Sequence, residues 1–365
     1  MSTRSPFMTP DQSRRRRELA RQQRRRRRMI GLGSFVVLVV AAVVIAIALS
    51  QSGGASHHSS GPSAHAKVKL RKPPVKPAVS AIGLPLAKPA LTLAGVGSPQ
   101  HDVVHVNFHN PPRAGILFNL DTGQVLWQRN PYTRLRIASL TKMMTALLTV
   151  ESQPASARVL ITKAAVNSAG SKVGVLPLGK HVRLETMLYG LLLPSGNDAA
   201  IALAQHVAGS INGFVKQMNA RAAQLGMGCT RYSSPSGYFN ANNFSCAADL
   251  AVLAHVDEQQ PRLARIVRTY SKQLPLPIKG GKVYLYNNNP LLIYHYPGVT
   301  GLKTGFTDAA GRCLVATAER DGVRLGVVVL HSPNPGTQAK QLLDRGFEGV
   351  YHQAPVTEPP MPAGA

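Results

Sequence analysis

The fold of this chain is decided by one stretch, Ala138-Ser139-Leu140-Thr141-Lys142-Met143-Met144-Thr145. From position 140 onward, apolar residues recur in the i, i+3, i+4, i+7 pattern that predicts a helix over residues 139–151 with one buried face. Lys142 stands among these apolar residues, three positions after Ser139, a spacing that places its amine near the serine hydroxyl. Lysine is rarely buried without a partner. The stretch therefore predicts a serine nucleophile at the positive end of a helix dipole, with Lys142 as the base that removes its proton.

A second polar motif, Ser195-Gly196-Asn197, follows directly after Pro194. Pro194 ends an apolar helix predicted over residues 184–193, and a further helical pattern covers residues 199–207. The motif is therefore expected in a turn that presents a hydroxyl and an amide side by side to a cleft. We expect Ser195 to relay the proton to a leaving group and Asn197 to bind the amide of a substrate.

A third motif, Lys303-Thr304-Gly305, comes shortly before a strand predicted over residues 313–318, so we expect it at a strand edge. Lys303 is the natural cation to lower the pKa of Lys142. Thr304 is expected to hydrogen-bond a terminal carboxylate. Gly305 has no side chain, so a substrate strand could approach its backbone closely.

Each motif also has an ordinary structural explanation. Ser139 could cap a helix, Lys142 and Lys303 could be solvated charges, and Asn197 could be a turn residue. One such explanation is plausible for any single motif. All three motifs in this order favour the catalytic interpretation.

The three motifs resemble those of serine enzymes that bind penicillin. Residues 138–145 resemble the active-site helix of the low-molecular-mass penicillin-binding proteins, the serine D-Ala-D-Ala carboxypeptidase family, and the similarity runs from about residue 115 to residue 347. The resemblance implies an α/β (α+β) fold of the penicillin-binding transpeptidase/β-lactamase type, an antiparallel sheet flanked by helices. It also implies an oxyanion hole formed by the backbone N–H groups of Ser139 and Phe306.

By this resemblance we expect a D,D-carboxypeptidase that acts on peptidoglycan pentapeptide stems through an acyl-enzyme on Ser139, with β-lactam antibiotics as covalent inhibitors and with neither cofactor nor metal. Carboxypeptidase members often carry an Arg before the last helix, but residues 332–337 contain none, so a D,D-endopeptidase is the alternative. A β-lactamase and an inactive wall-binding module are weaker hypotheses. Many members also carry a second, β-rich domain and a C-terminal amphipathic helix, and we expect neither in this chain.

Hydrophobic patterning predicts the rest of the domain. Residues 115–120 and 124–128 form a hairpin signal around Asp121-Thr122-Gly123, and helical patterns cover residues 211–225 and 338–347. Further strands are predicted over residues 283–286 and 325–330, and a turn at 320–322 joins the latter to the strand predicted over residues 313–318. Strands at both ends with helices between them predict an antiparallel sheet in an α/β domain. The acidic pair Asp257 and Glu258 is expected in a polar loop before Pro261.

The N-terminal region has the pattern of a membrane anchor. The chain carries a formal charge of +26, and its first 28 residues hold eleven Arg against two acids. Residues 29–49 are an uncharged apolar run, long enough to span a bilayer. With the positive-inside rule this predicts an uncleaved signal anchor in the cytoplasmic membrane, with the domain on the extracytoplasmic side. A cleaved signal peptide is the alternative, and nucleic-acid binding is not expected.

The remaining divisions follow from composition. Residues 1–28 form a basic cytoplasmic segment, residues 50–104 a flexible tether rich in Pro, Lys and Ser without a packed core, residues 105–350 the peptidase domain and residues 351–365 a Pro-rich tail. Cys229, Cys246 and Cys313 are expected as three free thiols, although one pair could form in an oxidising compartment.

Overall fold

A computed structural model of the chain describes residues 79–81, 83–238 and 242–355. Contacts divide the chain into two units, Met1–Leu70 and Arg71–Ala365, and every described residue belongs to the second. The predicted basic segment 1–28 and membrane span 29–49 lie outside the described residues. Within the described part, no helix is long and apolar enough to cross a membrane.

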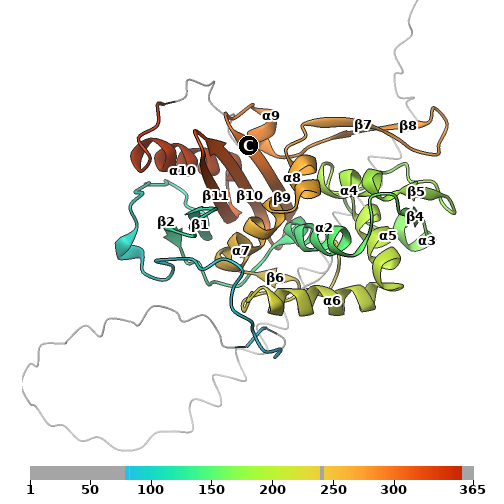
Figure 1. The fold of residues 1–365 in the computed structure, drawn as a ribbon, viewed down its shortest axis with the longest axis horizontal. Coiled ribbons are helices and arrows are strands. Elements are labelled where there is room, and N and C mark those ends of the chain that lie inside the picture. Colours follow the sequence, from blue (N-terminus) through green and yellow to red (C-terminus); the bar gives the residue numbers. More distant parts are fainter. Residues whose placement is uncertain (1–78, 82, 239–241, 356–365) are drawn as a thin grey trace, which may run out of the picture. The chain divides into compact units, whose positions relative to one another are not determined.

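The domain is built on a five-stranded antiparallel sheet with the strand order β2-β1-β11-β10-β9 (Figure 1). Its strands are β1 (Ala114–Asn119), β2 (Val125–Arg129), β9 (Val299–Thr307), β10 (Gly311–Arg320) and β11 (Val323–Ser332). Among the described strands, β9 pairs with β10 alone, in a register that places Lys303 opposite Val315 and Gly305 opposite Cys313. The third motif therefore lies within β9, an edge strand that the sequence pattern did not predict, and not just before the strand predicted over residues 313–318.

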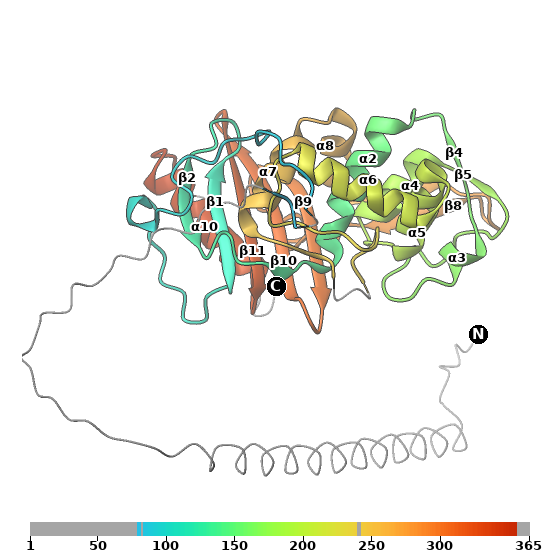
Figure 2. The same ribbon diagram turned by 90° about the horizontal axis from the view of Figure 1, so that it is seen from below.

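Helices cover both faces of this sheet. Helix α10 (Pro335–Gly349) packs on one face, where Leu314 and Phe347 belong to the same buried cluster. Helices α2 (Thr141–Ser152), α7 (Ala247–Glu258) and α8 (Pro261–Val267) lie on the other face. A further group of helices, α3 (Lys163–Val166), α4 (Leu184–Leu192), α5 (Asn197–Ala208) and α6 (Ile211–Gln224), lies beyond α2, away from the sheet (Figure 2).

Short elements connect these layers. They are the 3-10 turns η1 (Pro99–His101) and η2 (Ala138–Leu140), helix α9 (Pro290–Ile293), and three two-stranded ribbons: β3 (Leu135–Arg136) with β6 (Phe244–Ser245), β4 (Arg158–Leu160) with β5 (His181–Arg183), and β7 (Ser271–Pro275) with β8 (Lys282–Tyr286). The β3–β6 ribbon brings the chain to η2, which leads directly into α2.

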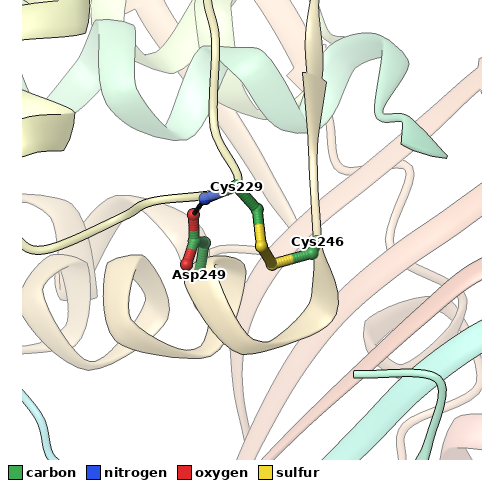
Figure 3. Close-up of side chains that lie close together, drawn as sticks. All are labelled: Cys229, Cys246 and Asp249. Carbon is green, nitrogen blue, oxygen red and sulfur yellow. Dashed lines mark hydrogen bonds between the residues drawn. A yellow bond between two sulfur atoms is a disulfide. The ribbon is translucent and has the colours of Figure 1, made fainter. Parts of the chain in front are cut away.

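A disulfide joins Cys229 and Cys246, whose Cα atoms lie 5.7 Å apart, while Cys313 is a free, buried thiol (Figure 3). The expectation of three free thiols was therefore wrong, because the spacing of cysteines in a sequence does not reveal which side chains meet. Asp249 lies beside the bridge and accepts hydrogen bonds from the Cys229 amide at 2.7 Å and the Thr230 hydroxyl at 2.8 Å. Both sulfurs are used in the disulfide, so this cluster offers no thiolate ligand to a metal.

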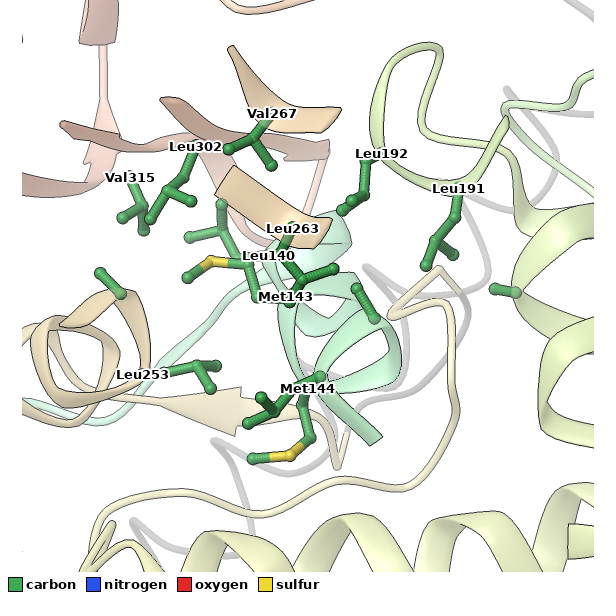
Figure 4. Close-up of a cluster of buried hydrophobic side chains, with 14 of the residues drawn as sticks. Leu140, Met143, Met144, Leu191, Leu192, Leu253, Leu263, Val267, Leu302 and Val315 are labelled. Carbon is green, nitrogen blue, oxygen red and sulfur yellow. The ribbon is translucent and has the colours of Figure 1, made fainter. Parts of the chain in front are cut away.

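Helix α2 lies at the centre of the larger core. Leu140 and Met143 pack with Leu302 of β9 and Val315 of β10, while side chains from α4, α7 and α8 complete the cluster (Figure 4). A helix buried on most of its surface is held in place by packing, so the residues that begin it are held as well. The nucleophile predicted at its start therefore has a rigid support.

Two predictions about the sequence are wrong, because residues predicted to be exposed pack in the interior. Asp257 and Glu258 do not lie in a polar loop but are buried at the end of α7, where the Glu258 carboxylate accepts a 2.7 Å hydrogen bond from Thr317. The stretch that precedes residue 105 is not entirely a free tether either. Leu91 is buried in the core, and Ala94 forms a β-bridge with Gln124. Isolated apolar residues between prolines can fill a groove without any periodic pattern.

Candidate active site

Ser139 lies in η2, one turn before the regular part of α2. Lys142 Nζ donates a hydrogen bond to the Ser139 hydroxyl at 2.8 Å. The predicted i, i+3 pair is thus a direct contact. Its geometry suits transfer of a proton from the serine to the amine.

The Lys142 amine is fully buried. Besides Ser139, it donates to Asn197 Oδ1 at 2.7 Å and to the Ser236 carbonyl at 3.0 Å. Burial, and next the positive charge of Lys303, lower the pKa of Lys142 well below its usual value, whereas the Asp198 carboxylate opposes this shift. Because the neutral amine is thereby favoured, Lys142 has the electrostatic environment of a general base.

Lys303 lies on β9 with its side chain buried, and its Nζ donates to the Thr304 carbonyl at 2.9 Å. Burial lowers the pKa of Lys303 to about 7. This lysine lies behind the substrate cavity rather than among its lining residues. Its effect on the chemistry must therefore pass through its charge, as predicted for its influence on Lys142.

Ser195 occupies the loop between α4 and α5 in a left-handed conformation with φ of 65°. Its hydroxyl is buried and makes no hydrogen bond with any part of the chain that the structure describes. The loop is fixed by its neighbours, since Gly196 N donates to the Gly190 carbonyl at 2.9 Å. A strained, fixed backbone that holds a hydroxyl without a partner is typical of a position with a catalytic role.

Asn197 is placed differently from the expectation. Its Oδ1 accepts from Lys142, and its Nδ2 donates to the Ala169 carbonyl at 2.6 Å. The side chain is buried and does not line the cavity beside Ser139. In this structure both ends of the Asn197 amide are used inside the protein, so its visible role is to orient Lys142.

A cavity of about 490 Å³ opens over the nucleophile and is lined by Ser139, Ser195, Thr304, Gly305 and Phe306. The same cavity is lined by these further residues: Ser171, Asn288, Pro290, Ile293, Tyr294, Arg312, Cys313 and Pro335. The structure thus brings five of the eight predicted site residues to one surface and places Lys142, Asn197 and Lys303 directly behind it.

Glycine at position 305 is required by the contact between β9 and η2. A Cβ added there would lie 2.9 Å from the Ile137 carbonyl and 3.2 Å from Ser139 N. The close approach keeps the Ser139 amide next to β9, where the Phe306 amide follows in the chain. This proximity is consistent with the oxyanion hole that the resemblance implies.

One contributor was missed from the sequence, namely the loop that contains Ser236 and Gly237. The Ser236 carbonyl contacts Lys142, and Gly237, with φ of 76°, packs against the Ala138 carbonyl. Asn243 holds this loop, because its Oδ1 accepts from the Ser233 amide and its Nδ2 donates to Thr141 Oγ1 at 3.2 Å. The sequence Ser-Ser-Pro-Ser-Gly at residues 233–237 is typical of a turn, but the residues that this turn contacts are known only from the fold.

Comparison with known proteins agrees with this geometry. The sequence pattern of the D-alanyl-D-alanine carboxypeptidase family, peptidase S11, matches residues 109–334. The D-alanyl-D-alanine carboxypeptidase DacF of Bacillus subtilis is 34% identical over 243 residues, which cover 64% of this chain and 62% of that protein. A D-alanyl-D-alanine endopeptidase of Pseudomonas aeruginosa is 35% identical over 235 residues, which cover 60% of this chain and 75% of the relative.

Among solved structures, a D-alanyl-D-alanine carboxypeptidase from Mycobacterium tuberculosis is similar with a TM-score of 0.64 and 33% identity. That match covers 72% of this chain and 99% of the solved one. With its serine–lysine pair on a buried helix and its edge-strand motif, the chain is a serine peptidase of the penicillin-binding fold. It belongs to the D-alanyl-D-alanine carboxypeptidase family.

Proposed function

We propose that the chain is a serine D,D-carboxypeptidase that removes the terminal D-Ala from peptidoglycan stem peptides through an acyl-enzyme on Ser139. The observation that carries this proposal is the 2.8 Å contact between Ser139 Oγ and the Nζ of a fully buried Lys142 whose pKa is lowered. A serine hydroxyl reacts well only beside such a base.

In the acylation step, neutral Lys142 takes the proton from Ser139 as Oγ bonds to the carbonyl carbon of the scissile peptide. The backbone N–H groups of Ser139 and Phe306 stabilise the negative charge on the carbonyl oxygen. Collapse of this intermediate breaks the C–N bond, and the departing D-Ala amine takes up a proton. We assign the relay of that proton from Lys142 to Ser195, whose hydroxyl is buried and whose side chain belongs to the lining of the cavity.

In the deacylation step, a water molecule attacks the acyl carbon and gives its proton to Lys142, which passes a proton to Oγ as the bond between Oγ and the acyl carbon breaks. Departure of D-Ala leaves room for this water in the cavity. Serine is regenerated, and the shortened peptide leaves with a new carboxylate. The same groups thus serve both steps in opposite directions, as microscopic reversibility requires.

The alternative, a D,D-endopeptidase that cuts cross-links, is supported by the lack of Arg in residues 332–337 and by the similarity to an endopeptidase. A different cation lines the cavity, however. Arg312 on β10 lies opposite Phe306 in the sheet register, and its guanidinium donates to the Pro333 carbonyl at 3.0 Å. A guanidinium here could bind the terminal carboxylate of an exopeptidase substrate, which favours the carboxypeptidase.

The decisive experiment is mass spectrometry of purified muropeptides after incubation with the purified full chain. Release of D-Ala from pentapeptides and cleavage of cross-linked dimers are scored separately. D-Ala release that is lost in Ser139→Ala supports the proposal. Cleavage of dimers without D-Ala release would establish the endopeptidase instead.

We also propose that residues 29–49 anchor the chain in the cytoplasmic membrane and place the domain on the extracytoplasmic side. The Arg-rich segment before this run and its length support this topology. A disulfide in the domain fits an oxidising compartment. N-terminal sequencing of the mature protein tests the anchor, and a mature chain that begins near residue 50 would refute it.

A further inference from the structure

A second cavity, of about 280 Å³, lies close to the nucleophile and is lined by three arginines, Arg113, Arg134 and Arg136, together with His331. Its other lining residues, Leu135, Phe244, Ala309 and Ala310, are uncharged. We propose that this arginine cavity is a subsite for a carboxylate carried by the peptide substrate, upstream of the scissile bond. The proposal rests on the proposed function.

The charged side chains that line the arginine cavity are all positive. In the part of the chain that the structure describes, none of its lining residues is acidic, and no ion pair joins Arg113, Arg134 or Arg136 to a carboxylate. The neighbouring acid along the chain, Asp308, is exposed and is not part of the lining. Like charges gathered in a concave surface repel one another, and an anion relieves that repulsion.

All three arginines are exposed, and the guanidinium of one of them, Arg134, contacts the protein. Arg134 lies over the Phe244 ring, with its guanidinium carbon 5.7 Å from the ring centre, and donates to the Gly228 carbonyl at 3.4 Å. Arg136 belongs to β3, where it pairs with Phe244 in the ribbon. Each guanidinium presents a planar fork of donors, which matches the two oxygens of a carboxylate.

His331 adds a further polar group. Its Nδ1 donates to the Ala310 carbonyl at 3.0 Å, because a carbonyl oxygen can only accept. That bond fixes the imidazole ring at the end of β11, next to Gly311.

Position relative to Ser139 argues that the anion belongs to the substrate. Arg136 precedes Ser139 by only three residues, so their Cα atoms are at most about 11 Å apart. The same β9–β10 hairpin lines both cavities, through Phe306 and Arg312 in one and through Ala310 in the other. A peptide that acylates Ser139 and continues in an extended conformation covers this distance in about three residues.

The test compares two synthetic peptides that end in D-Ala-D-Ala and differ at one position, about three residues before the scissile bond. One peptide carries a free side-chain carboxylate there, and the other a carboxamide. With the wild-type full chain, we expect the carboxylate peptide to have a KM about threefold to tenfold lower, as for one charge-assisted hydrogen bond in a partly exposed site. High salt should reduce this difference.

The double variant Arg113→Ala/Arg134→Ala should lose the discrimination by raising KM for the carboxylate peptide alone. Arg134→Lys should retain part of it, because the charge remains but the planar fork does not. Arg183→Ala removes an exposed arginine of the distant β5 strand and is the matched control, which should discriminate like the wild type.

The outcomes separate the two proposals. Penicillin acylation of Ser139 reports whether each variant is folded and whether the serine chemistry exists. If D-Ala is released from both peptides but the wild type does not distinguish them, or the double variant still does, the subsite is wrong and the proposed function stands. If neither acylation nor D-Ala release occurs in the wild type, both proposals fail.

Discussion

The Nζ atom of Lys142 lies 2.8 Å from Ser139 Oγ and donates two further hydrogen bonds, to Asn197 Oδ1 and to the Ser236 carbonyl. Those two oxygens can only accept, whereas the serine hydroxyl can both donate and accept. When the amine is neutral, its two N–H bonds therefore point to Asn197 and Ser236, and its lone pair must face Ser139. The surroundings thus orient the base as well as lower its pKa.

Replacing Lys142 by arginine tests the base directly. We expect Lys142→Arg to slow acylation by penicillin by about a thousandfold, because a guanidinium keeps its proton in proteins and cannot accept another. Stopped-flow kinetics with a fluorescent penicillin measure the rate. Lys216→Arg makes the same change on an exposed face of α6 and should have no effect. A near-normal rate in Lys142→Arg would show that another group is the base.

Asn197→Ala distinguishes two roles for the amide. Because the side chain contacts Lys142 and not the cavity, we expect the variant to reduce kcat about a hundredfold while KM changes little. The original expectation that Asn197 binds the substrate's amide predicts the reverse, a raised KM. Steady-state kinetics of D-Ala release separate the two, and a raised KM at constant kcat would restore the substrate-binding role.

The pH dependence of acylation should show the coupling between the two lysines. The rate rises with pH as Lys142, whose pKa is lowered, loses its proton. Lys303, with a pKa of about 7, helps to hold that value down while it is charged. In Lys303→Ala the cation is gone, so the pKa of Lys142 increases and the rising limb moves to higher pH.

The acylation rate is measured as a function of pH for the wild type, for Lys303→Ala and for Thr304→Ala, a control variant that keeps both lysines. That variant should be slower without a shift of the rising limb. An unshifted limb in Lys303→Ala would mean that burial alone sets the pKa of Lys142.

Substitution of Gly237, in the loop that contains Ser236, should reduce both the stability of the protein and the rate of acylation. A Cβ at this position would overlap the Ala138 carbonyl oxygen, and φ of 76° is unfavourable for alanine. We expect Gly237→Ala to lower the free energy of unfolding by more than about 3 kcal/mol and to slow acylation at least about tenfold.

Gly322 is a matched control, since it has the same φ of 76° but nothing lies within 4 Å of the position that an added Cβ would occupy. Gly322→Ala should cost about 1 kcal/mol, from backbone strain alone, with normal acylation. Denaturant unfolding and penicillin kinetics measure both quantities. Equal losses of stability and of acylation rate in the two variants would mean that the close approach of Gly237 to Ala138 contributes to neither quantity.

Much of the fold could be predicted because the elements involved have regular patterns. The apolar period after Ser139 marked α2, and Pro194 marked the end of α4. Helix α7 was missed because it is apolar all round, so no face stands out and its terminal acids suggested a loop.

The motifs also located the site, but not the roles within it. Sequence spacing brought Ser139 and Lys142 together because i, i+3 contacts are local. Whether Asn197 faces the substrate or Lys142 depends on how α5 packs against α2, and the contact of Ser236 joins residues 94 positions apart. Such long-range contacts, like the pairing of Cys229 with Cys246, leave no periodic trace in a sequence.

The last prediction separates the peptidase from a β-lactamase. A β-lactamase must hydrolyse its penicilloyl-serine quickly, and class A enzymes use a Glu acting through a water for this step. No carboxylate is among the described residues that line the cavity over Ser139. Asp249 is engaged beside the disulfide, and Glu258 is buried under the sheet, where it accepts from Thr317.

We therefore expect penicillin to leave a long-lived adduct on Ser139. Opened penicillin keeps its leaving group tethered, so water has no place to enter, whereas D-Ala departs from a peptide acyl-enzyme and admits water. Mass spectrometry of the intact protein should show one penicilloyl group that persists after free penicillin is removed and is missing in Ser139→Ala. Rapid catalytic clearance of penicillin by the purified full chain would overturn the assignment, because fast hydrolysis of the penicilloyl ester would call for a carboxylate base, and none is among the described residues that line the cavity over Ser139.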